Sequence, residues 1–317
     1  MLQILLGALM LGLLWAVMTI GIYITYRILG IADLTVEGSI AMGAAIAASC
    51  IYSGVNPYLA TLLALLGGMA AGLCTGLLHT RLKIPALLSG ILTMIALYSI
   101  NLRILGKANV SLLRMDTVYT NFMKMSFTNN AVFTKLGVTH LIPVIILGMI
   151  IVFGIITILY WFFGTEIGCS IRATGDNPQM SRAQGINTNN MIIIGLVISN
   201  GLVAVSGALI AQQQSFADIQ MGTGSIVIGL ASVIIGEVLF SKRSFFIRLV
   251  SLVLGAITYR VIIALVLKMG MPANDLKLFT AITVAVALSL PEFGSYLRPI
   301  TKSIKGGASG AIRKQSL

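Results

Sequence analysis

Few side chains in this sequence could take part in catalysis or bind a metal ion. Only two of the 317 residues are histidines, His79 and His140, and the three cysteines, Cys50, Cys74 and Cys169, are far apart. Neither a His-Glu-x-x-His run nor a pair of closely spaced cysteines is present, so we expect no catalytic residue and no bound metal. Isolated cysteines of this kind are typical of small packing residues.

Three charged residues, Glu37, Glu237 and Arg260, lie in otherwise apolar stretches. Charges inside a membrane are costly, and they often mark a transport pathway or an internal ion pair. We expect Glu37 and Glu237 near the cytoplasmic ends of their helices and Arg260 deeper in the membrane. Arg260 could pair with a carboxylate inside the bundle, or it could face the pathway and attract an anionic group.

A polar segment at 164–190 carries the clearest local signals. Asn177 is a good N-cap, Pro178 suits the first helical position, and Gly185 suits the left-handed residue that follows a helix. Together they predict a two-turn helix from Pro178 to Gln184. A helix this short is marginal alone in water, so it must pack against its own bundle or lie in a groove of a partner.

The remaining elements are predicted to be membrane-spanning helices. The chain is 57% hydrophobic and 9% charged, with a mean hydropathy of +0.99. Crossing a bilayer takes roughly 20 apolar residues in a helix. About nine hydrophobic segments fit, at 4–26, 38–80 (two spans divided by a turn at 53–57), 84–102, 141–163, 191–211, 219–236, 249–267 and 273–290. The expected fold is an all-α, polytopic transmembrane helix bundle.

The first segment does not have the features of a cleavable signal peptide. No Lys or Arg precedes it, its apolar core is too long, and no small-residue cleavage site follows. We therefore expect it to stay in the mature protein.

The basic residues predict the orientation of these helices. The net charge of +12 needs no nucleic-acid partner if the basic residues gather on one side, as the positive-inside rule requires. An N-terminus outside and a C-terminus in the cytoplasm achieve this. The cytoplasmic set is then Arg27, Arg81, Lys83, Arg172, Arg182, Lys242, Arg243, Arg298, Lys302, Lys305, Arg313 and Lys314, against Lys107, Arg114, Lys124, Lys135, Lys268 and Lys277 outside.

Two glycine patterns concern packing and symmetry. Gly68, Gly72 and Gly76 recur every fourth residue, which favours close packing inside one bundle over a dimer seam. The run 32–43 also echoes the run 217–229 and, with the expected topology, could be half of an inverted repeat, although chance similarity explains it equally well. In a true repeat, Asp33 and Asp218 would cap helix starts near opposite membrane faces.

Two motifs carry a resemblance to a known family. The run Gly168 to Asn187 resembles the cytoplasmic coupling loop of permeases for branched-chain amino acids and ribose-type sugars in bacterial ATP-binding-cassette importers. The run Gly30 to Ser39 is similar to the segment that opens the second helix of these permeases. The resemblance covers Leu13 to Leu290 and is closest to a branch linked to tryptophan and tyrosine uptake.

The resemblance implies a cytoplasmic docking helix and a set of partners. The helix would seat in a nucleotide-binding ATPase subunit through residues of the coupling loop, which are Arg172, Gly175, Asp176, Asn177, Pro178, Gln179, Arg182 and Gly185. Among these, Arg172, Asp176, Asn177 and Arg182 would orient the helix. The chain has no Gly-x-x-x-x-Gly-Lys-Ser/Thr run, so it would bind no cofactor itself, and ATP and Mg would sit on the partner.

The resemblance also implies the organisation of the chain. Residues 1–291 would form the permease domain, with an outer loop at 106–139 and the coupling loop at 164–190, and 292–317 would be a basic cytoplasmic tail. Two copies would form a path through the bacterial cell membrane for a small solute delivered by an extracytoplasmic binding protein. The resemblance implies an amino acid as this solute and, more narrowly, an aromatic one. The outer loop could be a solvated linker or a docking site for such a partner.

Two other function classes stay open from the residues alone. A secondary transporter or channel would share the glycine-interrupted spans but would need no ATPase partner. An intramembrane enzyme is much less favoured, because the catalytic motifs are absent.

Overall fold

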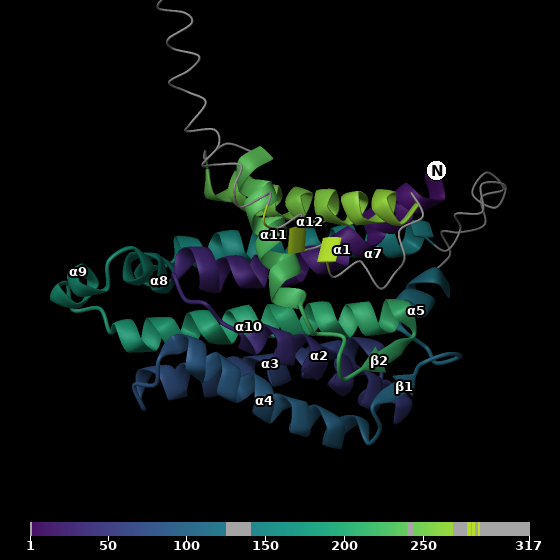
Figure 1. Ribbon diagram of the computed structural model, residues 1–317, viewed down its shortest axis with the longest axis horizontal. Coiled ribbons are helices and arrows are strands. Elements are labelled where there is room, and N and C mark those ends of the chain that lie inside the picture. The colour runs from purple at the N-terminus through teal and green to yellow at the C-terminus, as the bar shows by residue number, and fades with distance from the viewer. Residues whose placement is uncertain are drawn as a thin grey trace, which may run out of the picture.

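The computed structural model describes residues 2–124, 141–239 and 244–268, and positions 278, 279, 281, 282 and 285. Figure 1 shows helices running alongside one another, with α8 and α9 at one end of the molecule. The opposite end carries α5, β1, β2 and the N-terminus. We call these the α8–α9 end and the strand end. Most of the ninth predicted segment, 273–290, the tail 292–317 and the outer-loop residues 125–139 lie outside the described residues.

The described part of the chain is almost entirely helical, as expected. Its elements in chain order are α1 (Leu2–Tyr23), the π-helical turn η1 (Ile24–Ile28), α2 (Thr35–Tyr52), α3 (Pro57–Thr80), α4 (Ala86–Leu105), β1 (Asn109–Ser111), α5 (Val118–Lys124), α7 (Leu141–Gly164), α8 (Glu166–Asp176), α9 (Pro178–Ala183), α10 (Thr188–Gln214), β2 (Phe216–Asp218), α11 (Ser225–Leu239) and α12 (Phe245–Lys268). Seven of these helical segments are long and apolar enough to cross a membrane, and Ser225–Val238 is a shorter apolar helix. The all-α transmembrane bundle is therefore confirmed.

Helix α10 is the centre of the bundle and packs against α1, α2 and α3. A Cβ atom at Gly68 or Gly72 of α3 would overlap a carbonyl oxygen of α10, that of Asn200 or Leu196. The glycines therefore let the two backbones touch, within one bundle as predicted.

Hydrogen bonds from buried hydroxyl groups also tie α10 to α1. The Ser199 hydroxyl donates to the Gly21 carbonyl at 2.7 Å, and that of Ser206 donates to the Leu14 carbonyl at 2.8 Å. Such bonds between membrane helices contribute about 0.6 kcal/mol each on average.

Helix α2 begins inside the bundle and not at its end. The chain leaves the helical conformation after η1, and α2 starts at Thr35. Its first turn already lies beside the second turn of α4, since a Cβ at Gly90 would meet the Leu34 nitrogen at 2.8 Å. Glu37 lies in the first turn of α2, near a helix end as we expected, but this helix end is set back from the end of the bundle. The apolar sequence pattern did not reveal this late start.

Two three-residue strands join distant parts of the chain at the strand end. Strand β1 pairs with β2 in antiparallel register, with Val110 opposite Ala217. Residues 219–224 then run from β2 back into the bundle, and α11 begins at Ser225. Both α2 and α11 thus follow non-helical stretches. The same two stretches are aligned with each other in the candidate repeat, in which 32–43 corresponds to 217–229.

Asp33 and Asp218 both bind backbone N–H groups just before these two helices. Asp218 accepts from the Gln220 nitrogen, and Asp33 accepts from the Thr35 nitrogen at 2.9 Å. Asp33 is 3% exposed and also binds Asn200, so it has a role inside the bundle beyond capping a helix at the membrane face.

Candidate functional site

The two-turn helix predicted in the polar segment is α9. The Asn177 side chain accepts hydrogen bonds from the Gln179 and Met180 nitrogens at 3.1 and 3.0 Å, and Pro178 occupies the first turn. The helix ends at Ala183, and Gly185 follows with φ = +83°. Local signals alone therefore predicted both ends of this helix to within one residue.

Helix α8 precedes α9 and fixes it to the bundle, an element that our sequence analysis missed. Its N-cap is Thr165, whose hydroxyl accepts a hydrogen bond from the Gly168 nitrogen at 3.3 Å. Near its end, a Cβ at Gly175 would overlap the Ile28 carbonyl oxygen of η1. Gly175 thus lets α8 press against the end of the first membrane helix, so α8 and α9 are seated firmly.

The outward side of α8 and α9 is exposed and partly apolar. The Met180 side chain is 59% exposed and that of Ile167 is 47% exposed, although both are apolar. Of the α9 residues, only Ser181 is buried. Sequence reasoning singled out charged and capping residues here and overlooked Met180, although a methionine at the tip of a polar loop is a usable signal for a contact surface.

The two arginines of this segment point back toward the bundle. Arg182 Nε donates to the Thr188 hydroxyl at 2.8 Å, which holds α9 against the start of α10. Arg172 Nη2 donates to the Phe163 carbonyl at 2.9 Å, and its guanidinium lies over the Phe245 ring at 5.6 Å. Asp176 is exposed at the end of α8.

A cavity of about 500 Å³ lies behind α8, between η1 and the start of α12. Arg172 and Asp176 line it together with Arg27 and Arg248. Two of the predicted coupling residues, Arg172 and Asp176, thus lie next to the end of α1 and the start of α12.

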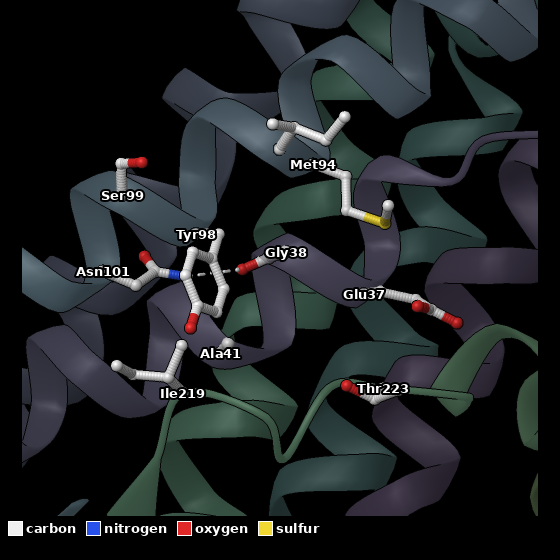
Figure 2. Close-up of a pocket in the computed structure, with 10 residues that line it drawn as sticks. Glu37, Gly38, Ala41, Met94, Tyr98, Ser99, Asn101, Ile219 and Thr223 are labelled. Carbon is white, nitrogen blue, oxygen red and sulfur yellow. Dashed lines mark hydrogen bonds between the residues drawn. The ribbon is translucent and has the colours of Figure 1, made fainter. Parts of the chain in front are cut away.

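A second hollow lies within the bundle, between α2, α4 and the stretch before α11 (Figure 2). Its volume is about 370 Å³. Its lining comprises Glu37, Gly38, Ala41, Met94, Ile95, Tyr98, Ser99, Asn101, Ile219 and Thr223. Gly38 packs against Met94 and Leu97, near the middle of the 20-residue helix α4. The hollow, called the Glu37 pocket below, therefore lies near mid-depth in the bundle.

The Glu37 side chain is half-buried at the edge of this pocket. Its Oε1 accepts a hydrogen bond from the Gly224 nitrogen at 3.0 Å, which ties the start of α2 to the start of α11. Asn101 is 1% exposed and donates through Nδ2 to the Gly38 carbonyl at 3.2 Å, the bond drawn in Figure 2. Asn101 and Thr223 are pocket residues that sequence reasoning missed, because it considered only charged residues within spans.

The other two charges found in spans lie elsewhere. Glu237 Oε1 lies 2.9 Å from Arg27 Nε, near the end of α11, in agreement with its expected place near a helix end. The Arg260 guanidinium lies 4.0 Å from the centre of the Trp15 ring. No carboxylate among the described residues pairs with Arg260, so the aromatic ring takes the place of the expected ion partner.

The described residues contain no group of three or more His, Cys, Asp or Glu side chains that could hold a metal ion. The candidate functional regions are the exposed side of α8 and α9 and the Glu37 pocket.

The sequence matches, over residues 4–287, the family described as the branched-chain amino acid transport system permease component. The chain belongs to this family. The permease is 40% identical over 278 residues to a tyrosine transport system permease protein of Clostridioides difficile (strain R20291), covering 88% of each chain. It is 31% identical to the uncharacterized protein RP368 of Rickettsia prowazekii (strain Madrid E), covering 90% of this chain and 97% of that one.

A more distant relative of the permease is a sugar transporter component. The ribose import permease protein RbsC of Escherichia coli (strain K12) is 28% identical over 214 residues, which span 66% of the permease and 61% of the relative. No solved structure was found to match the permease. The resemblance inferred from Gly168–Asn187 and Gly30–Ser39 is thereby confirmed, and the permease is a multi-pass component of an ATP-binding-cassette importer in the bacterial cell membrane.

Proposed function

We propose that the permease imports an aromatic amino acid, delivered by an extracytoplasmic binding protein and driven by a separate ATPase subunit. The observation that carries the ATPase assignment is the exposed, firmly seated pair α8 and α9. In this proposal the α8–α9 end is cytoplasmic, as the distribution of basic residues predicts.

The exposed tip of α9 suits a groove on the ATPase subunit. Met180 would contribute an apolar anchor, and Asp176 and Gln179 would contribute polar contacts around it. Arg172 and Arg182 are hydrogen-bonded to the permease itself. We therefore assign them to holding α8 and α9 in place, so that a movement of the groove passes to α1 through Gly175.

The Glu37 pocket is the best candidate for part of the transport pathway. A carboxylate that faces hydrocarbon is costly, roughly 2.5–3.5 kcal/mol for an acidic residue at mid-membrane on an insertion scale. Glu37 is half-buried and has no basic partner among the described residues. The open side of the pocket is then expected to face a second copy of the permease or water, which supports a homodimer with a central path.

The substrate assignment comes from similarity. The C. difficile relative is named for tyrosine transport and covers most of the chain, whereas the ribose permease is more distant. Arg260, covered by Trp15, and Glu237, paired with Arg27, are given structural roles in this proposal.

Affinity purification of the permease from its native membrane in mild detergent tests the proposal. A stoichiometric ATPase subunit should co-elute, and the complex should take up L-tyrosine when it is reconstituted with its binding protein and ATP. A preparation that repeatedly lacks an ATPase, yet transports, would refute the proposal in favour of a secondary transporter.

A further inference from the structure

The cavity behind α8, called the arginine cavity below, has an excess of positive charge. Among the described residues, its charged lining consists of Arg27, Arg172, Arg248 and Asp176. Glu237 adds a second carboxylate, because its Oε1 lies 2.9 Å from Arg27 Nε. The arginines still outnumber the carboxylates around them, so an anion that entered the cavity would be attracted.

Arg248 is the arginine best placed to meet an anion. Its side chain is exposed, and it forms no ion pair with a carboxylate among the described residues. It interacts with the Tyr23 hydroxyl, which holds it at the cavity. Arg172 is also without a carboxylate partner in the described part of the chain, and the Phe163 carbonyl fixes its position. A guanidinium group presents five N–H donors in a planar fork, which suits the oxygen atoms of a phosphate group.

Aromatic side chains next to the cavity indicate its depth in the membrane. Tyr160 and Trp161, near the end of α7, are 51% and 72% exposed. Tyrosine and tryptophan gather at the level of the lipid headgroups in membrane proteins. The Tyr160 ring packs against the Phe246 ring, with 5.8 Å between their centres, and the preceding residue, Phe245, lines the cavity. The arginine cavity therefore lies beside the headgroups of the bilayer.

We propose that the arginine cavity binds the phosphate group of an anionic phospholipid, with Arg248 and Arg172 as its ligands. Basic pockets between membrane helices at this level suit anionic headgroups. The volume of about 500 Å³ is within the range of roughly 300–1,000 Å³ that is usual for small-molecule sites, so it holds a phosphate and part of a headgroup. The inference goes beyond the proposed import function and does not rest on it.

A phosphate in this cavity would join the coupling segment to a membrane-spanning helix. Arg172 belongs to α8, and Arg248 lies in the first turn of α12. Two arginines at one cavity repel each other, and a shared anion turns this repulsion into attraction. The bound lipid would thus brace α8 against α12.

The first experiment uses the fluorescence of Trp161 in the full-chain permease. The sequence contains two tryptophans, and the other one, Trp15, is 8% exposed, so lipids with brominated acyl chains should quench mainly Trp161. The permease is reconstituted in mixed bilayers in which either phosphatidylglycerol or phosphatidylcholine is brominated. Phosphatidylglycerol should be preferred next to Trp161 by a factor of at least about five, the effect of one arginine near an anionic headgroup. Equal quenching by the two lipids would overturn the inference.

Arg248→Gln tests the site itself, and Arg81→Gln is the matched control. Arg81 is an exposed arginine that caps the end of α3, which packs beside the start of α10, and it does not line the cavity. Arg248→Gln should lower the preference for phosphatidylglycerol about five-fold, whereas Arg81→Gln should keep the wild-type preference. Equal losses in the two variants would mean a diffuse surface charge and would refute a defined site.

A second measurement separates a lipid from a free anion and needs only the wild-type protein. The thermal unfolding midpoint of the full-chain permease in mild detergent is compared after addition of short-chain phosphatidylglycerol, short-chain phosphatidylcholine or inorganic phosphate. The midpoint should rise with phosphatidylglycerol alone, because ligands that bind the folded state stabilise it. An equal rise with inorganic phosphate would refute the lipid as occupant, and no rise with phosphatidylglycerol would overturn the inference even if Arg248→Gln did not fold.

Discussion

The Asn200 amide donates a hydrogen bond of 2.7 Å to Asp33 Oδ2 and so joins two residues that are 167 positions apart in sequence. The same Asn200 side chain accepts from the Ser39 hydroxyl at 2.7 Å. All three side chains are buried, so the start of α2 is held to the centre of α10 by polar contacts that water cannot replace.

Replacing Asn200 with leucine should therefore destabilise the permease. The Asp33 carboxylate would lose the donor to its Oδ2, keeping only the Thr35 nitrogen at Oδ1, and the Ser39 hydroxyl would lose its acceptor, a cost of about 1–3 kcal/mol for each buried group. Thermal unfolding of the purified protein in detergent should show a lower midpoint. Asp33→Asn should cost less, and the double variant should cost less than the sum of the two, whereas strict additivity would argue against the contact.

The close contact of α3 with α10 predicts a steric effect. Gly72→Ala should destabilise the protein by about 1–3 kcal/mol, because the new Cβ would overlap the Leu196 carbonyl oxygen. Gly154→Ala in α7 is the control, since no atom outside its own helix lies within 4 Å of a Cβ at that position. Equal unfolding midpoints for the two variants would contradict the packing described for α10.

The stacking of Arg260 on Trp15 predicts that the ring stabilises the buried cation. Trp15→Leu should lower the free energy of unfolding by about 2 kcal/mol, the value of a desolvated cation–π contact. Trp15→Phe, which keeps an aromatic face, should lose less. If leucine and phenylalanine were equally tolerated in thermal unfolding, the ring would contribute only its apolar area.

The apolar tip of α9 predicts how ATP use is coupled to transport. Met180→Glu should reduce uptake at least ten-fold, because the introduced charge would have to be desolvated in the ATPase groove. Asn189→Glu adds the same charge at another exposed position in the first turn of α10, and it should leave uptake within about two-fold, since a carboxylate is favoured at a helix N-terminus. Normal uptake by Met180→Glu would place the contact elsewhere.

Charge reversal in the coupling segment gives an independent test. Asp176→Lys combined with Arg182→Glu should abolish uptake, because the first changes the exposed end of α8 and the second removes the bond that holds α9 to Thr188. The amount of permease in the membrane, measured by immunoblot, should not change. Normal ATP-driven uptake would refute the coupling assignment.

The sequence predicted those parts of this molecule that depend on local chemistry. Asn177, Pro178 and Gly185 determine the ends of α9 through their own backbone and capping preferences, so neighbours in space were not needed. The glycine spacing in α3 likewise predicted a close helix contact, although not that α10 would be the partner.

The depth of Glu37 could not be predicted, because it depends on where α2 begins relative to α4. Gly90 and Leu34 decide this through a contact between segments far apart in sequence. Asn101 gave too weak a signal for the same reason, because its hydrogen bond to the Gly38 carbonyl exists only in the folded chain. Met180 was overlooked although it is an apolar residue in a polar loop, and the folded chain leaves its side chain 59% exposed.

The pairing of β1 with β2 has a consequence for biogenesis. The Asn109 side chain donates to Asp218 across this pair, and the two residues are 109 positions apart. During synthesis β1 has no partner until α10 has been made, because β2 follows α10 in the chain. Because contacts between such distant residues form late, closure of the strand end should be among the last folding steps, and an unpaired β1 should mark an incompletely assembled chain for proteolysis.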